Sequence, residues 1–329
     1  MVELRDRALL PKVLVAFACI YFLWGSTFLA IRYAIAHLPP VLMCGLRLSS
    51  AGIMLMLIAF ARGQKWPTGR EWWNALAVGL LLPAFGNTSV TVGETHVPSG
   101  IVALLLGTIP LWTAVLAAIG PTAVRPGPQA VAGLLMGFAG IALLIGPGLA
   151  DARRAEFSPL WALIPIAGSA TWAWGSLYSR RVKMPRSPMV STAIGLTGGG
   201  LVLLLLSGAA GEWAHFSPAS VPASSWLALA YLSVFGSVVS FTAYLYLLEH
   251  VPPAVVATYA FVNPIVAMVL GFFIGHEVLS PRTLTAAALV VVAVALITTE
   301  RAGSPSAGGR GATNHTRVRT RWTRVRPSG

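Results

Sequence analysis

Long apolar runs dominate this chain. About ten such runs follow one another, separated by short polar islands that often contain proline, as at Pro39-Pro40 and Pro252-Pro253. A helix of about 20 apolar residues crosses a ~30 Å hydrocarbon core and satisfies its own backbone hydrogen bonds. Only 10% of the 329 residues are charged, too few to cover a water-facing surface of this size. The chain is therefore predicted to be an all-α integral membrane protein.

The runs predict ten transmembrane helices. Proline and glycine in the breaks end the helices and open short loops, and these loops leave no length for a separate soluble domain. The predicted helices span 13–36, 41–61, 72–92, 98–119, 129–149, 159–179, 189–208, 224–248, 253–275 and 283–299.

The basic residues orient the predicted spans. Eighteen of the 23 Lys and Arg residues fall on the side of the N-terminus, three fall on the other side, and Arg32 and Arg47 lie within spans. Basic loops stay in the cytoplasm, so both termini are predicted to be cytoplasmic, with segment 1–12 leading into the bundle. The tail, 300–329, is rich in Arg, Gly and Ser and is predicted to be disordered. The same bias explains the net charge of +13, so the lipid bilayer, and no nucleic acid, is the expected partner.

The chain contains an internal repeat. Residues 96–116 match residues 250–270 at 8 of 21 positions, and Trp24-Gly25-Ser26 recurs as Trp174-Gly175-Ser176. The predicted repeats are 13–149 and 159–299, with five helices each. Because five is odd, the second repeat must insert upside down relative to the first. Inverted repeats are typical of secondary transporters.

The order of the motifs resembles a known family. Trp24-Gly25-Ser26-Thr27, the run from His96 to Leu111, and the run from Val251 to Glu277 are similar to the two domains of an EamA-type permease of the drug/metabolite transporter superfamily. The resemblance covers the chain to about residue 299. It implies ten helices in two inverted five-helix repeats in the bacterial inner membrane. The implied activity is movement of small metabolites, amino acids or drug-like solutes, often outward, and a homodimer is left open.

Two prolines at matching repeat positions indicate the candidate site. Pro110 and Pro264 are predicted to kink helices four and nine at equivalent depths, because an interior proline removes one backbone hydrogen bond. Paired interruptions in corresponding halves point to a central substrate site, although a packing kink without a ligand is the alternative. Thr108 and Asn263 add polar groups beside the kinks. Hydrogen bonds without fixed charge suit neutral or zwitterionic solutes.

Other polar and aromatic residues within the spans complete the predicted substrate site. An intramembrane arginine such as Arg47 suggests function, but it could also extend to the headgroups, and Glu94 could pair with it. Core packing is the alternative for the aromatic residues, and helix-to-helix hydrogen bonding for the hydroxyl groups. This further set comprises Trp24, Ser26, Arg47, Asn87, Trp112, Trp174, Ser176, Tyr244 and Tyr259.

What the sequence lacks also limits the function. None of the ten acidic residues falls in the middle of a predicted span. Proton coupling through a buried carboxylate is therefore disfavoured relative to facilitated export by alternating access. The chain has no zinc-protease, nucleophile-elbow or nucleotide-binding motif, so no enzyme activity, cofactor or metal is expected. A membrane-embedded enzyme and a non-transporting receptor or scaffold are the alternatives to a transporter of small-molecule substrates.

Overall fold

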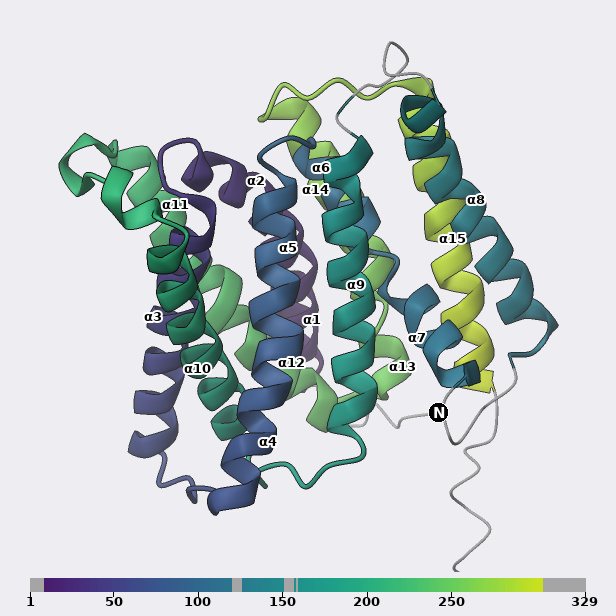
Figure 1. Ribbon diagram of the computed structural model, residues 1–329. Helices are drawn as coiled ribbons and strands as arrows, with labels where there is room; N and C mark the ends of the chain where they lie inside the picture. Colours follow the sequence, from purple (N-terminus) through teal and green to yellow (C-terminus); the bar gives the residue numbers. More distant parts are fainter. Residues whose placement is uncertain (1–8, 120–125, 151–156, 158, 304–329) are drawn as a thin grey trace, which may run out of the picture.

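The computed structural model describes residues 9–119, 126–150, 157 and 159–303. Every regular element in these residues is helical, and the helices stand side by side in one bundle (Figure 1). The first half contains α1 (Leu9–Ala18), η1 (Cys19–Leu23), α2 (Trp24–Ile35), α3 (Pro40–Ala61), α4 (Gly69–Gly79), η2 (Leu80–Ala84), α5 (Phe85–Gly93), α6 (Ser99–Leu106), α7 (Ile109–Ile119) and α8 (Pro128–Ala150). The second half contains α9 (Pro159–Ser179), α10 (Pro188–Ala209), η4 (Glu212–His215), η5 (Pro218–Ser220), α11 (Ala223–Ser233), η6 (Val234–Val239), α12 (Ser240–His250), α13 (Pro253–Val256), α14 (Tyr259–Phe273) and α15 (Pro281–Gly303).

Eight helices in the described residues are long and apolar enough to cross a membrane. Helical segments occupy all ten predicted positions, but α9 and the interrupted pair α13–α14 are not among the eight. The first helix begins at Leu9, four residues earlier than predicted, and the last one ends at Gly303, four residues later. The remainder of the predicted N-terminal segment and basic tail, 1–8 and 304–329, lies outside the described residues.

Three of the long helices contain a π-helical segment. η1 joins α1 to α2, η2 joins α4 to α5, and η6 joins α11 to α12. A π-helical turn adds one residue to the turn and breaks the regular backbone hydrogen bonding, and such turns frequently occur at functional sites. η2 begins at Leu80 and η6 at Val234, so they are 154 residues apart, which is the offset of the sequence repeat. The two halves therefore distort their third helices at equivalent positions.

Helices four and nine are each interrupted by a short turn before the proline that was predicted to kink them, and Pro264 lies inside α14. Helix four is interrupted by a turn at 107–108, and Pro110 is the second residue of α7. At that position a backbone N–H would have no partner within the helix, so proline costs no hydrogen bond there. Helix nine is interrupted at 257–258, six residues before Pro264. The prediction of kinks at equivalent depths is thus wrong in detail, because the break in the second half lies one helical turn farther from its proline.

Helices from the two halves pack against each other in matched pairs. α3 packs against α10, and α8 against α15. The α3–α10 contact is close because small residues face each other. A Cβ atom on Gly52 would lie 2.4 Å from the Thr197 backbone nitrogen, and one on Gly200 would lie 2.4 Å from the Ser49 backbone nitrogen. Glycine is therefore required at both positions.

Carboxylates of the second half cap helices of the first. Glu212 accepts hydrogen bonds from the backbone N–H groups of Val41 and Leu42, at 3.2 and 2.8 Å, at the start of α3. Glu277 caps α6, and Glu300 accepts from a backbone N–H in the first turn of α8. A carboxylate at a helix N-terminus satisfies free N–H groups and the helix dipole. These contacts connect the two halves at the ends of the bundle.

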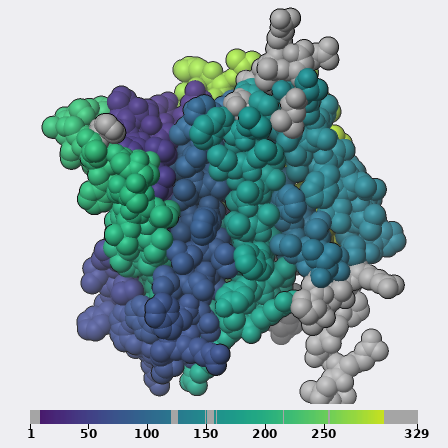
Figure 2. Space-filling view, in the orientation of Figure 1, coloured from purple at the N-terminus to yellow at the C-terminus, as the bar shows by residue number. Residues whose placement is uncertain are grey.

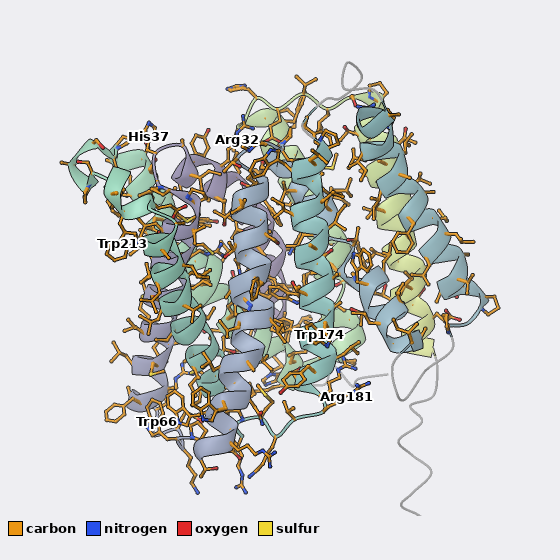
Figure 3. All side chains as sticks on the ribbon, in the orientation of Figure 1. Arg32, His37, Trp66, Trp174, Arg181 and Trp213 are labelled. Carbon is orange, nitrogen blue, oxygen red and sulfur yellow. The ribbon has the colours of Figure 1, made fainter. Side chains whose placement is uncertain are left out.

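The exterior of the bundle is interleaved and apolar. The space-filling view shows residues of the first half, in purple and blue, lying between green and teal residues of the second half (Figure 2). Trp213 lies at the upper end of the bundle and Trp66 at the lower end (Figure 3). Tryptophan is enriched at both membrane interfaces, so this placement fits a bundle that spans the bilayer between these two ends.

Candidate functional site

A cavity of about 210 Å³ lies between the two halves of the bundle. Its size suits a small organic solute, since ligand pockets are usually a few hundred Å³. Both halves contribute to its wall, and most of the wall is apolar. The lining residues include Trp24, Thr27, Phe28, Arg47, Gly86, Asn87, Val90, Pro110, Trp172, Ser237, Phe241, Tyr259, Asn263 and Pro264.

Aromatic rings form one side of the cavity. Trp24, at the start of α2, meets Phe241 edge to face with ring centroids 5.6 Å apart and meets Tyr259 with centroids 5.0 Å apart. Tyr244 packs behind them, 5.4 Å from Trp24 and 5.9 Å from Tyr259. Aromatic pairs in this geometry hold one another in place. The predicted residue Tyr244 therefore supports the wall, whereas Trp24 and Tyr259 line it.

Arg47 is the buried cation of this cavity. It lies on α3, only 4% of it is exposed, and its Nε donates to the Ser237 hydroxyl at 3.3 Å. Its Nη1 has no hydrogen-bond partner among the residues that the structure describes. A guanidinium group carries five N–H donors in a planar fork that matches a carboxylate. Arg47 therefore places a buried positive charge with an unused donor beside the cavity.

Two asparagines supply amide groups beside the π-helical segments. The Asn87 amide donates to the Pro83 carbonyl in η2, at 2.8 Å. In the orientation that satisfies its hydrogen bonds, the Asn263 amide donates to the carbonyls of Ile20 and Tyr21 in η1, at 3.2 Å each. Both residues line the cavity. Their amide nitrogens satisfy carbonyls of the distorted helices.

Besides Tyr244 and Trp174, four predicted site residues lie outside the cavity wall. Ser26 hydrogen-bonds to the Tyr231 hydroxyl at 2.6 Å, and Thr108 contacts the Ser169 hydroxyl at 3.2 Å, so both join helices of opposite halves. Trp112 packs edge to face against Phe138 of α8, with ring centroids 5.6 Å apart. Ser176 is half-buried and absent from the cavity wall. Hydroxyl groups at helix crossings satisfy each other, which removes Ser26 and Thr108 from the cavity.

The structure places Trp172 in the cavity and Trp174 outside it. Trp174 is 57% exposed on α9 and lies in the lower part of the bundle (Figure 3). Residues two apart on a helix point in nearly opposite directions, so only one of the pair can face inward. A Cβ atom on Gly86 would lie 2.4 Å from the Trp172 ring, so glycine there makes room for the indole. The Trp-Gly-Ser repeat pointed to the wrong tryptophan of the two.

A charged cluster lies near the upper end of the bundle. Arg32, which Figure 3 shows near the upper end, forms an ion pair with Glu277. The Glu277 carboxylate also accepts from the backbone N–H and the hydroxyl of Ser99, at 2.8 and 2.7 Å, and from the N–H of Gly100, at 3.1 Å. The sequence suggested that Glu94 would pair with Arg47, but in the part of the chain that the structure describes no such ion pair forms.

The fold and the cavity define a class of protein. A membrane-embedded helical bundle with two interlocked halves, broken helices in both and a central cavity between them is the architecture of a solute transporter. The chain belongs to the EamA-like transporter family, whose model matches residues 11–146 and 159–299. The family resemblance seen in the sequence is thus confirmed, and the same model matches each half separately.

Several relatives cover nearly the whole chain. The chain is 38% identical over 296 residues to the uncharacterized inner membrane transporter YedA of Escherichia coli K12, covering 90% of this chain and 93% of YedA. It is 25% identical to the uncharacterized transporter YvbV of Bacillus subtilis, covering 88% and 93%. It is 28% identical to the chloroplastic WAT1-related protein At3g02690 of Arabidopsis thaliana, covering 84% and 67%. One solved structure, described only as "Crystal structure of protein", shares the fold with a TM-score of 0.60 and 23% identity, covering 88% and 98%.

Proposed function

We propose that this protein is a secondary transporter of the bacterial inner membrane that exports small organic solutes by alternating access. The central cavity carries the proposal, because it lies between the halves and holds a buried cation with a free edge. Membership in the EamA-like transporter family and the relatives named as transporters support the class. The upper end is closed by the Arg32–Glu277 contact, and opening it would expose the cavity to that side.

The proposed mechanism needs two inverted five-helix repeats and ten spans, with both termini in the cytoplasm. Contacts between elements support the repeats, because most of them occur in matched pairs. The third helix of each half packs against the first helix of the other, as α5–α9 and α2–α11. The fourth helices meet as α6–α14. A two-fold relation between the halves would produce this pattern, and a rocking of one half against the other would open each end in turn.

The proposed substrate is a small solute with one carboxylate and an apolar body, which includes zwitterionic amino acids. Arg47 would bind the carboxylate, since a bidentate guanidinium–carboxylate contact is strong in a buried site. Trp24, Trp172 and Tyr259 would contact the apolar part. A solute with several negative charges would need more buried cations than this wall contains among its described residues.

Exchange in proteoliposomes tests the proposal. The purified protein is reconstituted, and exchange of radiolabelled phenylalanine, leucine and alanine is compared with exchange of the corresponding amides and decarboxylated amines. Protein-free liposomes are the control. We expect exchange of at least one amino acid and much slower exchange of its amide. Equal rates for the acid and the amide would remove Arg47 from recognition, and no exchange of any panel member would reject this substrate class.

A further inference from the structure

One carboxyl group in the upper part of the bundle has no partner. Glu94 directly follows α5 and is only 7% exposed. Neither of its carboxylate oxygens has a hydrogen-bond partner among the residues that the structure describes. An ionised carboxylate in such a place is unfavourable, because burial removes water that nothing else replaces. Burial raises the pKa of Glu94 well above its usual range, and the nearby Glu277 carboxylate raises it further.

None of the charged groups around Glu94 forms an ion pair with it among the residues that the structure describes. Arg32, from α2, faces it across the upper cavity but forms its ion pair with Glu277. Arg32 and, to a smaller extent, Arg47 on α3 lower the Glu94 pKa, but Arg47 makes no ion pair with Glu94 among the described residues. The imidazoles of His96 and His276 also line this upper cavity. Glu277 has hydrogen bonds to both of its oxygens, so of the two neighbouring carboxylates only Glu94 lacks stabilising donors.

Glu94 lies at the boundary between two cavities. Val90, one helical turn earlier on α5, lines the central cavity, while Glu94 lines an upper cavity of about 680 Å³. On α2, Ile31 likewise lines the central cavity and the next residue, Arg32, lines the upper cavity. A change in the charge of Glu94 can therefore affect both the Arg32–Glu277 ion pair and the central cavity.

We propose that Glu94 is a proton-binding site that holds its proton while the upper end of the bundle is closed and gives it to water when that end opens. On opening, water reaches the carboxyl group, the O–H bond breaks, the proton leaves on a water molecule, and the carboxylate remains. Arg32, which lines the same upper cavity, is then released from Glu277 and pairs with the Glu94 carboxylate. On closing, a proton from water returns to the carboxylate. One proton is bound and released in each such cycle.

Linkage gives the direction of the pH effect. The closed state binds the proton more tightly than the open state, so a lower pH favours closure and a higher pH favours opening. The sequence disfavoured proton coupling because no carboxylate lies in the middle of a predicted span. Glu94 is outside its span, and only the tertiary packing around the end of α5 makes it buried. The role of this proton rests on the proposed transport cycle, but proton binding to Glu94 can be measured without a solute.

Infrared spectroscopy on the full-length protein in lipid tests the site. A pH titration follows the C=O stretch of protonated carboxyl groups in the wild type, in Glu94→Gln and in Glu249→Gln, which alters an exposed carboxylate on α12. We expect a band that persists at neutral pH in the wild type and in Glu249→Gln, disappears at higher pH, and is absent from Glu94→Gln. A wild type without the band at neutral pH, or a band that survives in Glu94→Gln, overturns the proposal.

Thiol labelling tests the link to opening. Ile101 lines the upper cavity and is 3% exposed, so Ile101→Cys, with Cys19 and Cys44 changed to serine, reports access to it. Labelling by a membrane-impermeant maleimide is measured at rising pH with Glu94 present and in the Glu94→Gln background. We expect the labelling rate to rise several-fold more when Glu94 is present. The Glu94→Gln background corrects for the titration of the thiol itself. Equal pH dependence in the two backgrounds overturns the link. Neither measurement uses a solute, so both are independent of the exchange assay that tests transport.

Discussion

The Ser99 backbone N–H and hydroxyl both donate to one oxygen of Glu277, at 2.8 and 2.7 Å, across the boundary between the two halves. Charge-assisted hydrogen bonds contribute about 1.5–3 kcal/mol each when buried. We expect Glu277→Gln to lower the free energy of unfolding in mixed micelles by at least about 1.5 kcal/mol, because the Gln amide presents only one acceptor and leaves Arg32 without its anion. Glu249→Gln is the matched control and should unfold like the wild type; equal values for the two variants would show that the Glu277 contact contributes no stability.

Arg47 can be tested through solute binding. Removing one charge-assisted, buried contact of about 1.5–3 kcal/mol corresponds to a loss of roughly 10- to 100-fold in affinity. We expect Arg47→Gln to weaken binding of a transported amino acid by that factor, with little effect on the weak binding of its amide. Isothermal titration in detergent gives both constants. Arg62→Gln, at the exposed end of the same helix, should leave both unchanged, and an equal loss for acid and amide would mean that Arg47 shapes the cavity without binding the carboxylate.

Asn263 joins the cavity wall to the first helix. Asn263→Leu keeps a similar volume but removes the amide that donates to the Ile20 and Tyr21 carbonyls. We expect the variant to insert normally, to exchange solute at least about tenfold more slowly, and to unfold more easily by about 1–3 kcal/mol, because two acceptors lose their donor. Thr285→Leu is the control, since Thr285 is exposed on α15 and bonds only within its own helix. Exchange that survives Asn263→Leu but fails in the control would place the solute elsewhere.

Close packing of α3 and α10 makes one glycine of α10 irreplaceable and another dispensable. A Cβ atom on Gly200 would lie 2.4 Å from the Ser49 backbone nitrogen. A Cβ atom on Gly208 would lie 3.9 Å from the Trp213 indole nitrogen, which is an ordinary contact distance. We expect Gly200→Ala to lower the free energy of unfolding by about 1–3 kcal/mol through overpacking. Gly208→Ala should change it little or raise it by up to about 1 kcal/mol. The melting temperatures of both variants are measured by thermal unfolding in detergent. Similar melting temperatures would mean that α3 and α10 can move apart without a loss of stability.

The orientation of the chain can be tested in cells. The excess of basic residues on one side predicts that both termini are cytoplasmic. Fusions of a reporter that is active only in the periplasm, placed after residue 329 and within the 150–158 loop, should give opposite results. A reporter that is active at both sites, or at neither, would contradict ten spans with cytoplasmic termini.

The candidate site could be predicted from sequence only in part. Polar or aromatic residues beside the repeated prolines, such as Asn263 and Trp24, do line the cavity. Ser237 and Phe241 were missed, although their positions correspond by the repeat offset to Pro83, within the π-helical segment of the first half, and to Asn87, which follows that segment. The offset alone could have suggested them, but no single-residue property distinguishes a serine that faces a cavity from one that joins two helices.

The sequence by itself determined the class and course of the chain. Long apolar runs must become helices in hydrocarbon because each backbone polar group needs a partner within its own segment, and the predicted positions agree with the structure to within a few residues. The tertiary structure alone decided which face of each helix points inward, as with Trp172 and Trp174. It also decided which charges meet: Arg32 pairs with Glu277, 245 residues away in sequence, and Glu94 is left buried with no hydrogen-bond partner in the described part of the chain. Helix rotation and crossing set these contacts, and both depend on packing between segments that are far apart in the sequence.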